Sequence, residues 1–158
     1  MICLILLRET IESDIPEIYR YIHLNYVRKY YTNLEEQWKN HEKWYKFLIH
    51  STAYLLYTVT NTETGEFFGC VKFELDGECA TINIYLVEKI RNKGYSEKII
   101  DLSIEELKAK RPEISIILAY ILEENMASLS AFKRLNFEYD GVEEYKGIEH
   151  MLFIKTLD

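Results

Sequence analysis

The chain of 158 residues is long enough for one domain, and its hydrophobic fraction of 48% can fill one buried core without disulfide or metal staples. Nineteen basic residues against 26 acidic ones give a net charge of −7 at pH 7. Because this charge opposes attraction to polyanions, we expect no nucleic-acid partner.

The three cysteines, Cys3, Cys70 and Cys79, are odd in number and lack CxxC spacing. This pattern indicates neither a disulfide framework nor a zinc site. We therefore expect reduced, mostly buried thiols in a cytoplasmic protein that holds no metal.

The chain opens with an apolar run over residues 2–7 that leads directly into Arg8 and Glu9. The run is too short for the apolar region of a signal peptide, and no cleavage site follows it. We expect a first strand over roughly residues 2–8. No later segment is long and apolar enough to span a membrane, so no membrane partner is expected.

Two helices are predicted next. Asp14 is placed to cap the first, with Glu17 three positions on in a capping-box arrangement, and this helix should run through Tyr19 and Ile22. After the tyrosine-rich segment 25–32, apolar and aromatic residues recur at steps of three and four, which predicts a second helix. That stripe consists of Leu34, Trp38, His41, Tyr45 and Leu48.

Three consecutive antiparallel strands are predicted over residues 54–60, 67–75 and 80–87. A turn over residues 61–65 separates the first two. Asp76-Gly77, between the second and third, is the strongest hairpin signal in the chain.

The remainder alternates helix and strand. We expect a helix over 96–110 that ends before Pro112, a buried strand over 114–121, a short helix over 126–135 and a strand over 151–155. This order is typical of an α/β or α+β fold with a central mixed sheet. Because no repeat, low-complexity tract or linker interrupts it, we expect a single domain over residues 1–158.

An anion site is predicted where the strand over 81–87 leads through a loop into the next helix. The loop reads Arg91-Asn92-Lys93-Gly94-Tyr95-Ser96. Unpaired N–H groups of the loop and of the first helical turn converge there, and the helix dipole favours negative charge. Gly94 lets a diphosphate approach the backbone, while Arg91 and Lys93 add positive charge.

The loop RNKGYS resembles the RxxGxG/A signature of motif A in the GNAT superfamily of acetyltransferases, with Ser96 in place of the last small residue. A second segment resembles the family's closing pattern, in which Asn opens a short helix that ends in Gly-Phe. Its residues here are Asn125, Ser128, Phe132 and Asn136-Phe137. Asn125 is a good N-cap, and Asn136 occupies the position after the helix where glycine is usual.

This resemblance covers about residues 80–137 and implies a GNAT fold, with a mostly antiparallel mixed sheet of six to seven strands and about four helices. It also implies acetyl-CoA as cosubstrate, with the pantetheine arm beside the splayed end of the strand and the pyrophosphate on the loop. The implied cofactor-binding residues are Leu86, Val87, Arg91, Asn92, Lys93, Gly94, Tyr95, Ser96, Asn125, Ser128 and Phe132.

Attack of an amine on the thioester forms an oxyanion, which a backbone N–H of Leu86 or Val87 would stabilise by the match to the family. The amine must also lose a proton. The polar face of the strand offers Asn83 and Tyr85 for a water network in place of a carboxylate, and Glu74 on the neighbouring strand is the alternative base.

Many relatives place a tyrosine in the last helix to protonate the departing thiolate, but Phe132 occupies the matching position here. This departure removes the usual general acid. Water can serve as the proton donor, and Tyr120 or Tyr139 would substitute if either faces the sulfur.

Acceptor specificity is expected from the first two helices and the segment between them. Arg28 and Tyr30 suit a phosphate and a stacked ring, or else the tyrosines pack in the core and the cations are solvated. His41 is likewise an acceptor-site residue or a core histidine. Glu74 is also assigned to the acceptor site.

Four segments resemble one GNAT branch of bacterial nonulosonate-sugar pathways, which acetylates the 4-amino group of a UDP-linked deoxyamino sugar. They are HEKW at 41–44, GCVKFELD at 69–76, INIYLVEKIRNKGYS and ENMASLSAFKRLNF. A nucleotide-sugar amine is therefore the expected small-molecule acceptor, although the branch contains proteins with other acceptors.

Other functions stay open. The acceptor can be a protein N-terminus, a ribosomal protein or a polyamine, and the acyl group can be longer than acetyl. A non-catalytic acyl-CoA-binding module and a nucleotide-binding module of another fold are further alternatives. The superfamily often forms homodimers through its sheet or C-terminal strands, here around residues 138–157.

Overall fold

A computed structural model describes the backbone of residues 5–26 and 34–158 and the side chains of residues 5–21 and 38–158. Its centre is one seven-stranded sheet in the order β1-β2-β3-β4-β5-β7-β6. The strands are β1 (Ile5–Glu9), β2 (Tyr54–Asn61), β3 (Phe67–Asp76), β4 (Cys79–Leu86), β5 (Ile116–Ile121), β6 (Glu138–Tyr145) and β7 (Ile148–Thr156).

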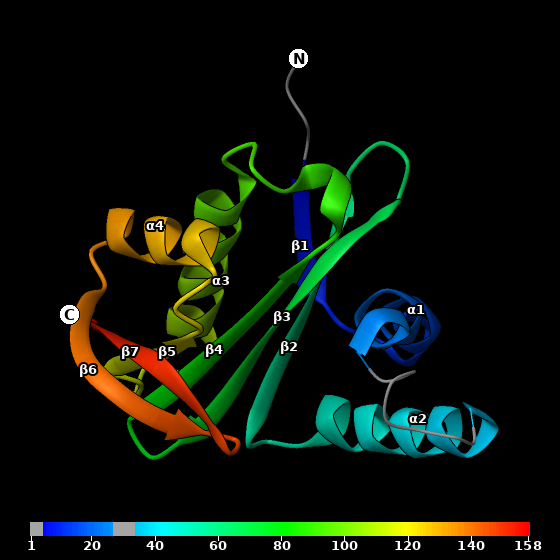
Figure 1. Ribbon diagram of the computed structural model, residues 1–158. Coiled ribbons are helices and arrows are strands. Elements are labelled where there is room, and N and C mark those ends of the chain that lie inside the picture. The colour runs from blue at the N-terminus through cyan, green and yellow to red at the C-terminus, as the bar shows by residue number, and fades with distance from the viewer. Residues whose placement is uncertain (1–4, 27–33) are drawn as a thin grey trace.

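Four α-helices cover the sheet, two on each side, as Figure 1 shows. α1 (Ile15–Tyr26) and α2 (Leu34–His50) lie on one face, and α3 (Tyr95–Lys110) and α4 (Met126–Arg134) lie on the other. Two short 3-10 helices are also present. η1 (Glu12–Asp14) precedes α1, and η2 (Glu88–Ile90) follows β4. None of the helices in the described part of the chain is long and apolar enough to cross a membrane.

The main core lies between the sheet and α3. Alternate residues of β3 and β5 point toward this helix, because successive side chains of a strand face opposite sides of a sheet. α3 contributes a buried stripe of Ile99, Ile100, Ile104 and Leu107. The strand residues of this core include Val71, Phe73, Ile117, Ala119 and Phe153, each at most 1% exposed.

β4 and β5 form the only parallel pair in the described sheet, and they pair over three residues only. The partners are Cys79 with Ile116, Ala80 with Ile117, and Thr81 with Leu118. β4 then continues to Leu86 and β5 to Ile121 without further pairing, so the two strands part. The sheet therefore has an opening between β4 and β5.

The predicted mixed, mostly antiparallel sheet and the four helices are confirmed. One strand was missing from the predicted elements. β6 reads EYDGVEEY, and six of its eight residues are exposed, because it forms the edge of the sheet. Its sequence therefore lacks the apolar alternation on which a strand prediction depends.

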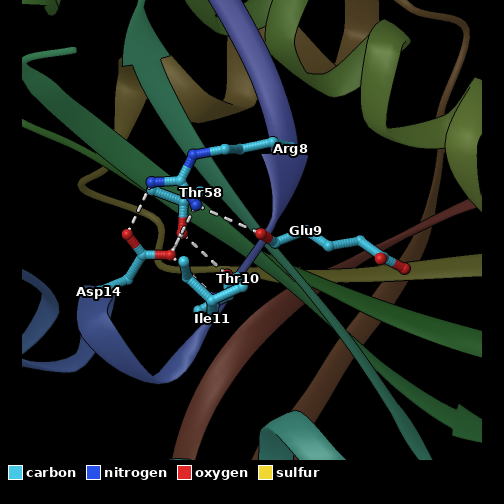
Figure 2. A network of polar contacts seen from close by, with 6 residues as sticks. All are labelled: Arg8, Glu9, Thr10, Ile11, Asp14 and Thr58. Carbon is cyan, nitrogen blue, oxygen red and sulfur yellow. Dashed lines mark hydrogen bonds and ion pairs between the residues drawn. The ribbon is translucent and has the colours of Figure 1, made fainter.

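The role predicted for Asp14 is wrong. Its carboxylate accepts hydrogen bonds from upstream, from the Ile11 N–H at 2.9 Å and from both terminal nitrogens of Arg8 at 2.7 Å. The Thr58 hydroxyl donates a further bond at 3.2 Å. Figure 2 shows how this network joins β1, η1 and β2. Asp14 thus fixes the path from the first strand into α1.

Burial of Asp14 alone would raise the pKa of its carboxyl group, but the bonds and charge of Arg8, with those of Ile11 and Thr58, outweigh it and lower the pKa. We expect Asp14→Asn to lower the free energy of unfolding by about 1.5–3 kcal/mol at pH 7, because it removes a bidentate charged contact. Urea unfolding measures this loss.

The pH dependence gives a second readout of the same contact. A lowered folded-state pKa stabilises the fold above the unfolded value of about 3.9, and this contribution is lost as the pH falls through the folded pKa. Below about pH 4 the stability gap between wild type and Asp14→Asn should therefore narrow. The exposed Asp101→Asn serves as the control, and a gap that stays constant with pH would contradict the assignment.

Candidate active site

The C-terminal end of β4 presents backbone groups to the opening between β4 and β5. Leu86 lies opposite Gly69 of β3, and the next N–H, that of Val87, donates to the Phe68 carbonyl at 2.8 Å. This pattern makes Leu86 and Gly69 a non-hydrogen-bonded pair, whose backbone groups point away from each other's strand. The Leu86 N–H is therefore directed toward the opening, whereas the Val87 N–H is used within the sheet.

Gly69 allows this close pairing of β3 and β4. A Cβ atom at this position would collide with the Tyr85 carbonyl oxygen and lie 3.0 Å from Leu86 Cδ2. The register of β3 with β2 also shifts here, between the partners of Val59 and Thr60. The absence of a side chain at residue 69 thus sets the position of Leu86.

The loop after β4 forms an anion cradle at the N-terminus of α3. Asn92 and Gly94 both have a positive φ, 59° and 83°, and no side chain caps the first turn of the helix. The backbone N–H groups of this turn therefore face outward with the positive end of the helix dipole. The cradle opens into a cavity of about 280 Å³ between α3 and α4, lined by Asn92, Gly94, Ser96, Glu97, Ala127, Ser130, Ala131 and Arg134.

Arg91 ties the cradle to the end of β4. Its Nε donates to the Leu86 carbonyl at 2.7 Å, and its guanidinium lies 5.4 Å from the centre of the Tyr85 ring. Lys93 is exposed, and Tyr95 packs against the core. Of the basic residues predicted in this loop, Arg91 is therefore the one in contact with the strand end.

α4 closes the far side of the cradle and is capped at both ends. The Asn125 side chain accepts from the Ser128 N–H at 3.2 Å. Asn136 has φ 68°, and the Phe137 N–H reaches the Phe132 carbonyl at 3.0 Å. Together with the bond from the Asn136 N–H to the Lys133 carbonyl at 3.0 Å, this contact forms a Schellman motif. The predicted caps are confirmed, although Asn125, Ser128 and Phe132 do not line the cavity.

A second cavity, of about 180 Å³, lies on the α1 and α2 face of the sheet, against the same part of β4. Its polar lining includes Lys72 from β3 and Asn83 from β4, which lie directly opposite each other in the ladder. The other lining residues are Ile18, Tyr45, Leu56, Cys70, Val71, Ile84 and Tyr85. The predicted polar pair Asn83 and Tyr85 thus faces a pocket.

Residues 5–138 match the protein family described as "Acetyltransferase (GNAT) domain". The chain belongs to the GNAT acetyltransferase family. It is therefore an acyltransferase, with acetyl-CoA as the cosubstrate. The opening between β4 and β5, the anion cradle and the cavity bounded by α3 and α4 fit the pantetheine and diphosphate of that substrate.

Solved structures with the same fold include three acetyltransferases. A ribosomal L7/L12 alpha-N-protein acetyltransferase in complex with coenzyme A is 19% identical, with a TM-score of 0.78 and coverage of 98% of this chain and 95% of that chain. A mutant of the Vibrio cholerae spermidine N-acetyltransferase is 16% identical, with a TM-score of 0.79 and coverage of 96% and 93%. The ribosomal-protein-S5-alanine acetyltransferase of Vibrio fischeri is 15% identical, with a TM-score of 0.76 and coverage of 99% and 94%. No curated protein matches the chain in sequence.

Three aromatic residues are relevant to protonation of the departing thiolate: Phe132, Tyr139 and Tyr120. Phe132 is 3% exposed and packs edge-on against Phe137, with ring centroids 4.9 Å apart, so it is a core residue. Tyr139 is 53% exposed on the edge strand β6. Tyr120 stacks on Tyr145 at 4.3 Å. No contact described here directs either tyrosine toward the end of β4.

Glu74, predicted as a base or an acceptor ligand, is held by three donors. Lys72 Nζ lies 3.4 Å from its Oε1, and Lys146 Nζ and the Tyr145 hydroxyl each lie 3.3 Å from the same atom. These contacts link β3 to the β6–β7 hairpin. Because all three donors contact Oε1, Glu74 is better suited to positioning these partners than to accepting a proton from the substrate.

His41 packs between α1 and α2 and is 7% exposed. Its ring lies 4.3 Å from that of Tyr45 and 4.9 Å from that of Tyr19. His41 is not among the residues that line the cavity, but it contacts Tyr45, which is. Arg28 and Tyr30 lie outside the described residues.

Lys72 is the polar lining residue that the sequence reasoning missed. Its signal was present, since it is the only charged residue of the run GCVKF, and both of its neighbours in the strand, Val71 and Phe73, are buried. Among the residues described, no group of three or more His, Cys, Asp or Glu side chains is arranged to hold a metal ion.

We expect Gly69→Ala to lower both stability and activity. The added methyl group must push β3 and β4 apart or twist Tyr85, at a cost of about 1–3 kcal/mol, and it moves the Leu86 N–H. Activity per folded molecule should fall about tenfold or more, since one oxyanion donor is worth at least that much. Unfolding curves and initial rates measure the two effects.

Gly77→Ala is the matched control for this substitution. Gly77 lies in the β3–β4 turn with φ 60° and open space around it, so its alanine variant carries backbone strain without the collision. The control should lose stability and keep its activity per folded molecule. Equal activity losses in both variants would show that the position of Leu86 is not set by Gly69.

Proposed function

We propose that the protein is an N-acetyltransferase that acetylates the primary amine of a small molecule, most specifically the 4-amino group of a UDP-linked deoxyamino sugar. The observation that carries the reaction is the Leu86 N–H, which is directed into the opening between β4 and β5. The cavity with Lys72 and Asn83 lies against the same strand and is the acceptor pocket in this proposal.

The reaction needs an oxyanion donor and a route for two proton transfers. The Leu86 N–H stabilises the carbonyl oxygen as the amine nitrogen forms its bond to the acetyl carbon. Asn83 and Tyr85 hold water that removes the amine proton. The Tyr85 hydroxyl donates to the Tyr21 carbonyl at 2.9 Å, which leaves its oxygen to accept from water. As the C–S bond breaks, water protonates the sulfur, because Phe132 offers no hydroxyl.

The sugar acceptor is supported by the segments that carry the resemblance. GCVKFELD and INIYL are part of β3 and β4, and they supply Cys70, Val71, Lys72, Asn83, Ile84 and Tyr85 to the acceptor pocket. HEKW precedes Tyr45, which lines the opposite wall. Two of the four resembling segments therefore line one pocket, which decides acceptor selectivity in this proposal.

Two alternatives have their own support. The solved structures of the same fold include enzymes named for ribosomal proteins and for spermidine, which favours a protein N-terminus or a polyamine as acceptor. A non-catalytic acyl-CoA-binding module is supported by Phe132 and by the three donors on Glu74.

The test is thiol release from acetyl-CoA with UDP-4-amino-sugars, polyamines and N-terminal peptides as acceptors. We expect release with the amino sugars. Release with another class of amine would change the assigned acceptor and leave the transferase mechanism unchanged. Measurable acetyl-CoA binding with no release from any amine would establish the binding module instead.

A charge-reversal variant of the cradle tests where acetyl-CoA binds. Arg91→Glu combined with Gly94→Asp places two negative charges beside the diphosphate, so the acetyl-CoA Kd should rise about tenfold or more. Gly65→Asp is the matched control, because Gly65 also has a positive φ, 75°, in a turn with open space around it. Calorimetry measures both, and an unchanged Kd in the double variant would place the cosubstrate elsewhere.

A further inference from the structure

We infer that Lys72 and Asn83 form an oxygen-recognition subsite, so that the acceptor carries a carboxylate, phosphate, carbonyl or hydroxyl oxygen near its amino group and is not a polyamine. This inference rests on the proposed function and narrows its substrate class. An amino sugar carries oxygen atoms near its amino group, whereas a polyamine carries only further ammonium groups.

The two side chains stand side by side on the floor of the acceptor pocket. Lys72 lies opposite Asn83 on one side and opposite Leu56 of β2 on the other, and all three residues line the cavity. Directly opposite residues of antiparallel strands have Cβ atoms about 4.5–5.5 Å apart. One small group of a ligand can therefore contact both side chains.

Both polar groups of this pair donate hydrogen bonds. The Asn83 Nδ2 is buried and has no hydrogen-bond partner among the described residues. A buried donor without a partner costs free energy, which a ligand oxygen would recover. The ammonium group of Lys72 can donate three hydrogen bonds and cannot accept any. The Lys72 side chain is 21% exposed. A ligand that fits this pair supplies lone pairs.

The charge around the pair is unfavourable for a second cation. Glu74 is shared between Lys72 at 3.4 Å and Lys146 at 3.3 Å, so two ammonium groups face one carboxylate. No Asp or Glu is among the described residues that line the cavity. Ile18 and Leu56 add apolar surface to the pocket, which strengthens electrostatic repulsion within it.

Burial, assisted by the charge of Lys146, lowers the pKa of Lys72 despite its contact with Glu74. The site therefore already disfavours the positive charge that it holds. A carboxylate or phosphate oxygen of the acceptor beside Lys72 would stabilise the positive charge of Lys72. The distal ammonium groups of a polyamine would destabilise it further. The pocket thus selects amines by the sign of the charge near the amino group.

The experiment compares two pairs of acceptors that differ in distal charge, and the members of the first pair also match in length. Thiol release from acetyl-CoA is measured with 4-aminobutyrate and with 1,4-diaminobutane, beside a UDP-4-amino-sugar and spermidine. Wild type should favour the oxygen-bearing member of each pair by about tenfold or more in kcat/KM. Lys72→Met should remove most of this preference, and Lys72→Glu should reverse it toward the polyamines.

Two controls keep the result interpretable. Lys98→Glu makes the same charge change at an exposed site on α3 and should keep the wild-type preference. The acetyl-CoA Kd should be unchanged in all Lys72 variants. If Lys72→Glu does not fold, the near-isosteric Lys72→Met decides alone.

A wild-type preference for polyamines, or a preference that neither Lys72 variant changes, would overturn the subsite and leave the acetyltransferase intact. Failure of every amine to release thiol, with acetyl-CoA still bound, would overturn the proposed function and the subsite with it. The two failures are therefore distinguishable in one set of assays.

Discussion

The parting of β4 and β5 after three paired residues is the constraint on which the active site depends. In a continuous sheet the backbone groups of β4 beyond Thr81 would bond to the neighbouring strand, since nearly all buried backbone groups are paired. Here the groups on that edge of β4 face the opening, and the Leu86 N–H among them is available to a ligand. The cradle at α3 and the acceptor pocket both adjoin this one length of β4.

The other edge of β4 determines which N–H is presented. The bond from the Val87 N–H to Phe68 fixes the phase of the β3–β4 ladder, and the alternation of the strand then turns Leu86 toward the opening. A slip of one residue would turn Val87 there instead and would move every side chain to the opposite face. Gly69 permits the close approach that holds this register.

Much of the fold, and the local structure of the loop and caps assigned to the cosubstrate, could be predicted because their signals are local. The hairpin at Asp76-Gly77, the loop around Gly94 and the caps of α4 depend on residues close together in the sequence. The acceptor pocket could not be predicted in this way. Lys72 and Asn83 become neighbours only through the register of β3 and β4, and Asp14 meets Arg8 and Thr58 only after β1 pairs with β2.

In the proposed acceptor pocket, the local charge differs in sign from the charge of the whole chain. A net charge of −7 is compatible with a cationic acceptor, and at long range it would attract one. Solvent and salt screen such a field within about 10 Å, whereas Lys72 acts at contact distance beside apolar walls. For the proposed subsite, we therefore expect the two ammonium groups on one carboxylate to outweigh the surplus of acidic residues elsewhere in the chain. In the proposed subsite, Lys72 sets the sign of the charge near the acceptor amine at the point where β3 and β4 meet.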